Sequence, residues 1–267
     1  MVHEEPLEGG NATAGVVRVG DTVRKPWERA TPAVHELMRT VSAAGIDVPS
    51  PLGRDEQGRQ ILEFVPGTLA LEAPRLSVDE LARVGAMIRA VHDACESFRP
   101  TEEPGWVPLI PSPGAEADLI CHGDLTPWNL LIGERWVFID WDGAAPSTRL
   151  WDLAYSAQAF TLNDVREDPA SAAPRLAALV DGYGAGPELR GDLPEAMAER
   201  TEAMHALLRR SHAEGREPWG DDVRLGARRA LACRGRSCRP ASRGLGPGAA
   251  TLSERPASLR SSVAPRS

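Results

Sequence analysis

The chain has 267 residues, of which 42% are hydrophobic and 25% charged, and its formal net charge is −8. These proportions are those of an ordinary globular protein, and they exclude a chain that is disordered throughout. No run of about 18 apolar residues is present, and the first ten residues are acidic and polar, so we expect neither a membrane span nor a signal peptide. The sequence therefore predicts a cytoplasmic protein that has no membrane partner.

The first 66 residues predict a small antiparallel sheet with one helix. Two β-prone runs, 14–19 and 22–25, flank a Gly-Asp turn and predict a hairpin. Residues 52–53 and 60–65 are expected to pair in the same way around a second polar turn. A helix is expected between the two pairs, because an apolar stripe with helical spacing follows Thr31, which can serve as its N-cap.

From Ser77 onward the chain becomes mainly helical. Ser77 and Glu80 have the spacing of a capping box, in which the side chain of each residue bonds to the main chain of the other. Residues 99–117 are rich in Pro, Gly and acids and predict a surface loop. Further helices are expected at 149–160, 170–183 and 193–210.

Composition changes near residue 222, so we expect three segments: 1–66, 67–222 and 223–267. The last segment contains ten arginines against one acid, which leaves a net charge of about −17 for the rest of the chain. It lacks a sustained apolar period and is expected to be disordered. Because it also lacks aromatic residues and an amphipathic helix, we do not expect it to bind nucleic acid. An acidic body would suit a cationic substrate.

The segment 119–132 carries the chemistry. It places the carboxylate of Asp124 and the carboxamide of Asn129 five positions apart, in a loop between two short apolar runs. Phosphoryl transfer from ATP needs a carboxylate that orients the attacking hydroxyl and oxygen ligands that hold Mg²⁺. Asp124 and Asn129 match these two needs.

A second carboxylate follows the β-prone run 136–139. Asp140 stands at the end of this run, where a hard cation such as Mg²⁺ finds the oxygen ligands that it prefers. Asp142 would point to the same side if the strand continued, but a turn is expected at Gly143. The role of Asp142 therefore stays open at this point.

These motifs carry a family resemblance. His-Gly-Asp-x4-Asn from His122, then Ile-Asp-Trp-Asp, then Leu-Trp-Asp-Leu-Ala at 150–154, resembles the aminoglycoside phosphotransferase family, whose fold is similar to that of protein kinases. The resemblance implies an α+β fold with two lobes, a small N-terminal antiparallel sheet lobe and a larger, mainly helical C-terminal lobe. It also implies that Asp124 is the catalytic base and that Asn129 and Asp140 bind Mg²⁺. The counterpart of His122 shapes the catalytic loop, so His122 is grouped with Asp124 in the catalytic set.

The same resemblance makes residues 1–66 the nucleotide-binding lobe and 67–222 the catalytic and substrate lobe. Gly10 belongs to the nearest candidate for a loop that covers the phosphates of ATP. A cation on a strand should contact those phosphates, and Arg24 or Lys25 fits; adjacent strand residues face opposite sides, so only one can point inward. Glu63 and Val65 lie in a segment that resembles the hinge whose main chain holds adenine.

The expected function is ATP- and Mg²⁺-dependent phosphorylation of a hydroxyl on a small molecule such as an aminoglycoside, an amino alcohol or a sugar. One alternative is a kinase-like binding protein without turnover, because the helical pattern fades after Trp219. A protein kinase is disfavoured, since only about ten residues separate Asp140 from Asp152 and no A-P-E element follows. A metal hydrolase would show clustered histidines, and these are dispersed. Four cysteines lack the spacing of a zinc site and are expected to be free thiols: Cys95, Cys121, Cys233 and Cys238.

Overall fold

The computed structural model describes residues 3–7, 15–101, 104–114, 116–164 and 166–215. The predicted phosphate-covering loop around Gly10, the segment 223–267, Cys233 and Cys238 lie outside these residues. None of the helices in the described ranges has both the length and the apolar character that a membrane crossing requires.

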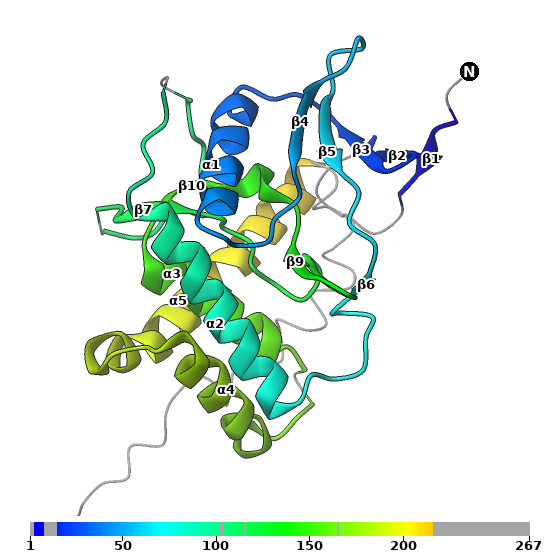
Figure 1. Cartoon of the computed structure of the whole chain (residues 1–267). Coiled ribbons are helices and arrows are strands. Elements are labelled where there is room, and N and C mark those ends of the chain that lie inside the picture. Colours follow the sequence, from blue (N-terminus) through cyan, green and yellow to red (C-terminus); the bar gives the residue numbers. More distant parts are fainter. Residues whose placement is uncertain (1–2, 8–14, 102–103, 115, 165, 216–267) are drawn as a thin grey trace, which may run out of the picture.

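The N-terminal part is a five-stranded antiparallel sheet (Figure 1) with the strand order β1-β2-β3-β5-β4. The predicted hairpin is confirmed, since Val19 pairs with Thr22 across the Gly-Asp turn. The second predicted pairing is confirmed too, with an irregularity between Pro51 and Gly53. The strands are β1 (Glu5–Pro6), β2 (Val17–Val19), β3 (Thr22–Lys25), β4 (Pro51–Arg54) and β5 (Gln60–Glu63).

Helix α1 (Thr31–Ala43) lies between β3 and β4 in the chain and buries one apolar face, which includes Leu37 and Val41. The prediction that Thr31 caps this helix is wrong. Thr31 is its first residue, and Ala30 precedes it without a side-chain cap. The Thr31 hydroxyl instead accepts a hydrogen bond from the main-chain N–H of Glu28 at 2.9 Å, so the turn before the helix uses it.

The rest of the described chain is mainly helical, which confirms the predicted α+β architecture. The capping box is confirmed at the start of α2: the Glu80 N–H donates to Ser77 Oγ at 3.2 Å, and the Ser77 N–H donates to Glu80 Oε2 at 2.8 Å. The three later helices are confirmed as well, and the last is longer than predicted at both ends. The helices are α2 (Val78–Cys95), α3 (Arg149–Thr161), α4 (Pro169–Tyr183) and α5 (Pro187–Glu214).

Two glycines allow α2 and α4 to approach closely. A Cβ atom added at Gly85 of α2 would lie 2.0 Å from the carbonyl oxygen of Leu179, and one added at Gly182 of α4 would lie 2.0 Å from that of Ala82. Real Cβ atoms do not come so near to main-chain oxygens. The separation of these two helices is therefore set by main chain against main chain.

Short strands hold the loop at 122–129 between the sheet and the helices. β7 leads into this loop and β8 leaves it; β9 then runs antiparallel to β8 and ends next to the turn that contains Asp140. The elements are β6 (Thr68–Leu69), β7 (Leu119–Cys121), β8 (Leu130–Ile132), β9 (Trp136–Phe138), the 3-10 turn η1 (Trp141–Gly143) and β10 (Ala145–Ser147).

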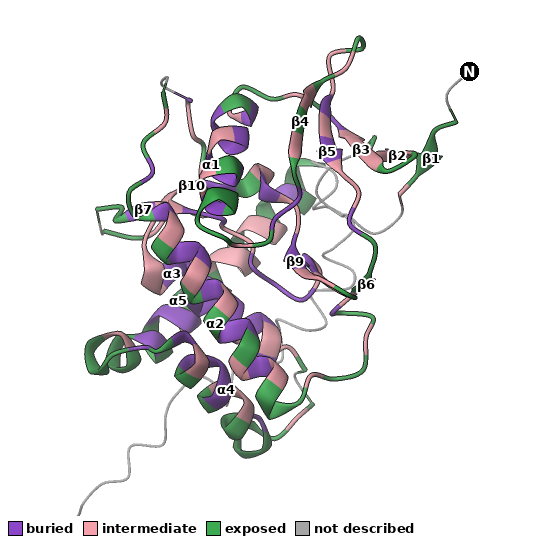
Figure 2. Cartoon of the chain, viewed as in Figure 1, coloured by how far each residue is buried: buried purple, intermediate pink, exposed green. Residues whose placement is uncertain are grey.

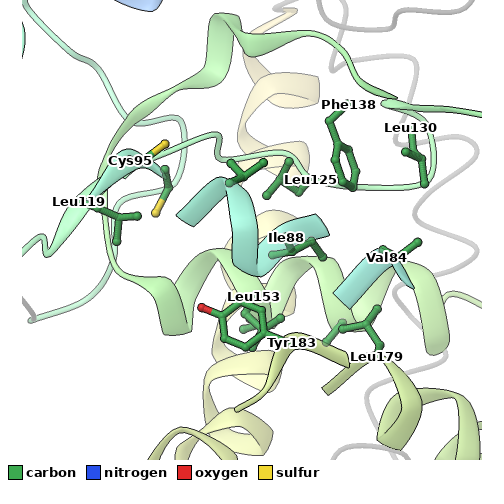
Figure 3. Close-up of a cluster of buried hydrophobic side chains, with 14 of the residues drawn as sticks. Val84, Ile88, Cys95, Leu119, Leu125, Leu130, Phe138, Leu153, Leu179 and Tyr183 are labelled. Atoms are coloured by element: carbon green, nitrogen blue, oxygen red, sulfur yellow. The ribbon is translucent and has the colours of Figure 1, made fainter. Parts of the chain in front are cut away.

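The hydrophobic core joins these elements. Buried residues follow the inward faces of α1, α2 and α3 (Figure 2), and a close-up shows side chains of α2 meeting Leu125 of the loop and Phe138 of β9 (Figure 3). Leu125 is fully buried, so the loop is anchored in the core. Cys95 and Cys121 are buried free thiols, as predicted.

Arg135 joins the sheet to the rest of the chain at the surface. Arg135, in the turn between β8 and β9, pairs with Glu63 at the end of β5 and with Asp47 before β4. The side chain of Glu63 also accepts a hydrogen bond from the main-chain N–H of Ser50 at 3.0 Å.

Candidate active site

The loop after β7 is shaped by His122 and Gly123. The fully buried His122 ring accepts the Asp124 N–H on Nδ1 at 3.2 Å, and its Nε2 lies 3.2 Å from the carbonyl oxygen of Ile139. This pair of partners defines a neutral ring that donates from Nε2. Burial also lowers the pKa of His122. His122 thus ties the loop to the chain just before Asp140, and it lies in the core instead of on the open side of the loop.

Gly123 stands where many protein kinases have an arginine. Its φ is +82°, a conformation that L side chains rarely adopt, and an added Cβ would lie 2.8 Å from the carbonyl oxygen of Gly143. The loop therefore packs against η1 through main chain, and this position requires glycine.

Three polar side chains hold Asp124. Trp128 Nε1 and Asn129 Nδ2 donate to its Oδ2 at 3.1 and 2.8 Å, and the Thr126 hydroxyl donates to its Oδ1 at 3.1 Å. Asn129 Nδ2 also reaches the main-chain oxygen of Asp124 at 3.1 Å. These bonds fix the carboxylate in one orientation. The sequence motif did not reveal the part played by Trp128.

The pKa of Asp124 is raised to about 6. Burial is the largest cause, since it disfavours the charged form, and the nearby charge of Asp140 adds to it. The hydrogen bonds from Trp128 and Thr126 and the positive charge of Arg200 act in the opposite direction. A carboxylate with such a pKa is mostly ionised at pH 7 and is still basic enough to accept a proton.

Asp140 has a left-handed main chain. Its φ and ψ are both 63°, and it is the one non-glycine residue with positive φ in the described part of the chain. Aspartate tolerates this region better than most residues, and such conformations cluster at functional sites. The chain turns sharply here, earlier than the expected turn at Gly143, and η1 follows at once.

Lys25 is the strand cation that reaches this turn. It is buried, and its Nζ lies 2.5 Å from Asp140 Oδ1 and 2.6 Å from Asp142 Oδ2. Burial alone would lower the pKa of Lys25, but the two carboxylates raise it above its usual value. Asp142 therefore belongs to the site, through the turn and not through a continued strand.

Two further residues of the sheet side reach the same cluster, and sequence reasoning missed both. Gln60 Nε2 donates to Asp142 Oδ1 at 3.0 Å and to the carbonyl oxygen of Pro26 at 3.0 Å. His35 lies 3.2 Å from Gln60 Oε1. Gln60 and Asp142 are 82 positions apart, and no local pattern links them.

Not every residue predicted to bind nucleotide lies at the cluster of Lys25, Asp140 and Asp142. Arg24 points away from Asp140, toward Thr22 and Asp55, so of the two adjacent cations only Lys25 faces inward. The side chain of Glu63 is engaged with Arg135. In the described residues, no hydrogen bond involves the main-chain N–H or C=O of Val65, which follows β5.

The side-chain oxygens of Asn129 and Asp140 are suitable ligands for a hard divalent cation. Asn129 uses its Nδ2 to bond Asp124, and no group in the described ranges bonds to its side-chain oxygen. The main-chain oxygen of Asn129 accepts from the N–H of Ile139 at 2.8 Å, which brings Asn129 next to Asp140. A carboxylate and an amide oxygen are ligands that suit Mg²⁺.

A second group of potential ligands lies elsewhere and does not fit a metal as well. His92, Cys121 and Asp152 are all buried, with ligand atoms within 4.8 Å of one another. The two His92 nitrogens already meet Asp152 at 3.1 Å and the Tyr183 hydroxyl at 2.9 Å. Burial raises the pKa of the Cys121 thiol well above its usual value, which disfavours the thiolate that a metal needs. This cluster holds α2 and α3 together.

The fold and the loop are those of a phosphotransferase. The family described as the phosphotransferase enzyme family matches residues 106–199. The chain is 30% identical over 242 residues to a trifolitoxin immunity protein of Rhizobium leguminosarum bv. trifolii, an alignment that covers 84% of this chain and 89% of that protein. The chain belongs to the phosphotransferase enzyme family.

Solved structures show the same protein-kinase-like fold at low identity. An amicoumacin kinase in complex with AMP-PNP and Ca²⁺ matches with a TM-score of 0.59 and 12% identity, over 79% of this chain and 83% of that chain. An aminopropanol kinase matches with a TM-score of 0.56 and 14% identity, over 78% of this chain and 83% of that chain. A spectinomycin phosphotransferase in complex with ADP and spectinomycin matches with a TM-score of 0.54 and 14% identity, over 87% of this chain and 89% of that chain.

Proposed function

We propose that the protein transfers the γ-phosphoryl group of ATP, with Mg²⁺, to a hydroxyl group of a small molecule. The observation that carries the proposal is the fixed carboxylate of Asp124, whose pKa is raised to about 6, next to the loop that ends in Asp140. Membership of the phosphotransferase enzyme family supports it.

In this proposal Asp124 orients the acceptor hydroxyl and accepts its proton as the oxygen attacks phosphorus. Trp128 and Asn129 keep the carboxylate aimed, so little reorganisation is needed at the moment of reaction. His122 acts from beneath the loop as a positioning residue.

Asn129 and Asp140 would hold the metal ion, and Lys25 would contact the nucleotide phosphates. When bound, Mg²⁺ would supply charge neutralisation for the transferring phosphoryl group. Lys25 is held in place by Asp140 and Asp142. This contact keeps the cation beside the predicted metal ligand.

The nucleotide is proposed to lie between residues 1–66 and residues 67–222. The main chain at Val65 is the candidate for adenine recognition, because its N–H and C=O make no hydrogen bond within the described residues. ATP is chosen over GTP by analogy with the AMP-PNP and ADP complexes of two structural neighbours, whereas two others contain GDP.

The acceptor is proposed to be a small molecule because the neighbours include an amicoumacin kinase, an aminopropanol kinase and a spectinomycin phosphotransferase. The related immunity protein suggests that phosphorylation could inactivate a toxin. Aminoglycosides, amino alcohols and sugars form the first test panel.

The test is a coupled nucleotide-consumption assay on the full chain, with ATP or GTP, with Mg²⁺ or EDTA, against this panel. Phosphorylated product should appear only with Mg²⁺, and Asp124→Ala should lower kcat by about 10³-fold or more. Asp192→Ala, an exposed acid on α5, is the matched control and should retain activity.

Wild-type-like turnover by Asp124→Ala would overturn the assignment of the base. Nucleotide binding without consumption over the whole panel would instead favour the kinase-like binding protein.

A further inference from the structure

Arg200 of α5 is a buried cation with an unusual environment. Only 5% of its surface is exposed. Its guanidinium carbon lies 3.9 Å from the ring centroid of Tyr155 and 5.8 Å from that of Trp151, both on α3. One flat face of the guanidinium is therefore stacked on an aromatic ring, which leaves its N–H edges to find partners elsewhere.

One of those N–H groups lacks a partner in the described part of the chain. Arg200 Nη1 is buried without a hydrogen-bond acceptor, and no carboxylate there forms an ion pair with Arg200. Arg175 also has one unpaired buried nitrogen, Nε, but its other two nitrogens bond to Glu167 and to the carbonyl oxygen of Thr161. A buried charge without a counter-ion costs free energy, so it is retained where something supplies the anion.

The position of Arg200 relates it to Asp124. Trp128, which donates to Asp124 Oδ2, also meets the Tyr155 ring edge-on with 6.0 Å between centroids, and Arg200 lies over the same Tyr155 ring. Asp124 and Arg200 thus lie near the two ends of one aromatic pair.

Asp124 is therefore flanked by opposite charges. The charge of Asp140, which lies in the turn after β9 and pairs with Lys25 of β3, acts on Asp124 together with the opposite charge of Arg200 on α5. If the nucleotide phosphates lie with Lys25, an acceptor can still reach Asp124 next to Trp128, whose ring contacts Tyr155 and through it Arg200.

We propose that Arg200 binds an anionic group of the acceptor, and that the acceptor is a hydroxy acid whose carboxylate pairs with the guanidinium while its hydroxyl meets Asp124. The proposal rests on the proposed phosphotransfer and narrows its substrate class. A planar carboxylate suits the guanidinium because two parallel N–H bonds can form at once. Although the whole chain is acidic, Arg200 brings a positive charge near Asp124.

The anion that Arg200 binds could also be the transferring phosphoryl group. The experiment therefore distinguishes an acceptor carboxylate from that phosphoryl group. Glycerate, 3-hydroxybutyrate and 4-hydroxybutyrate are each compared with the carboxamide of the same compound. The carboxamide keeps the hydroxyl and the shape but lacks the charge. The full chain is assayed as wild type, as Arg200→Gln and as Arg209→Gln, which removes an exposed arginine of the same helix.

For wild type, kcat/KM should be about 10-fold or more higher for at least one acid than for its carboxamide. Arg200→Gln should raise KM for that acid by about 10- to 100-fold, while kcat and KM for ATP change much less. Arg209→Gln should behave as wild type. Equal use of acid and carboxamide by wild type, a loss that falls equally on both, or a loss that appears mainly in KM for ATP would each overturn the proposal.

A binding readout keeps this test separate from the proposed function. The melting temperature of each protein is measured with and without the same acids and carboxamides, in the absence of nucleotide. Stabilisation of wild type by an acid and not by its carboxamide, lost in Arg200→Gln, would support the anion site even if no phosphoryl transfer is found. Transfer to the carboxamides alone would support the phosphotransferase and overturn the anion site.

Discussion

Lys25 of β3 and Asp140, 115 positions later in the chain, form an ion pair with 2.5 Å between Nζ and Oδ1. The same Nζ reaches Asp142, so one buried cation bridges two partly exposed carboxylates. The contact joins the sheet to the turn after β9.

Replacing this cation should destabilise the fold. In Lys25→Met the two carboxylates keep their positions without a counter-ion, and we expect a loss of about 3 kcal/mol in the free energy of unfolding. Urea denaturation at pH 7 measures the loss. Arg24→Met is the matched control: Arg24 contacts Asp55 at 3.5 Å on the other side of the strand, and its removal should cost less than about 1 kcal/mol. Equal losses in the two variants would contradict this account.

The pH dependence of turnover follows from Asp124. In the proposed mechanism transfer needs the ionised carboxylate of Asp124, and because burial raises its pKa to about 6, kcat should rise as the pH increases through about 6 and then level off. In Trp128→Phe the hydrogen bond that lowers this pKa is lost, so the rise should move to higher pH. Trp136→Phe, on β9, should leave the profile in place. Identical profiles for wild type and Trp128→Phe would show that another group controls the rise.

The close contact of α2 and α4 predicts a strong response to the smallest side chain. Gly85→Ala places a methyl group 2.0 Å from a main-chain oxygen, and the helices must separate to admit it. We expect a loss of about 3 kcal/mol or more in the free energy of unfolding. Gly191→Ala on α5, where nothing lies within 4 Å of an added Cβ, should be neutral or stabilising by up to about 1 kcal/mol.

Thermal and urea unfolding of the two variants and wild type provide the comparison. If Gly85→Ala unfolds with the same midpoint as Gly191→Ala, the contact between the two helices is not as tight as the structure has it.

Local signals made the elements predictable. The Gly-Asp turn between β2 and β3 and the capping box of α2 depend on residues two or three positions apart, and the structure confirms both. The cap at Thr31 was wrong for a local reason too: its hydroxyl had a second possible partner, the N–H of Glu28, and took it. The N-cap preference of threonine does not tell whether its hydroxyl accepts from a helix N–H or from the N–H of a residue before the helix.

The site was predictable only in part. Asp124 and Asn129 stand in one motif and Asp140 in the next, and the structure brings the two together through the hydrogen bond from the Ile139 N–H to the Asn129 carbonyl oxygen. Their chemical roles remain predictions. Gln60, Asp142 and Arg200 gain their importance from contacts between segments far apart in the chain, and periodicity carries no information about such contacts.

Arg135 gives the molecule a second ionic contact between the same two parts, and the two contacts differ in exposure. Lys25 is buried, whereas the side chains of Arg135 and Asp47 are more than one third exposed. Dissolved salt screens an exposed pair far more than a buried one. Separation of the sheet from the rest of the chain at Arg135 should therefore become easier as ionic strength rises, while the Lys25–Asp140 pair stays in place. If nucleotide binds between the two parts as proposed, its release should depend on ionic strength, whereas the position of Asp140 beside Lys25 should not.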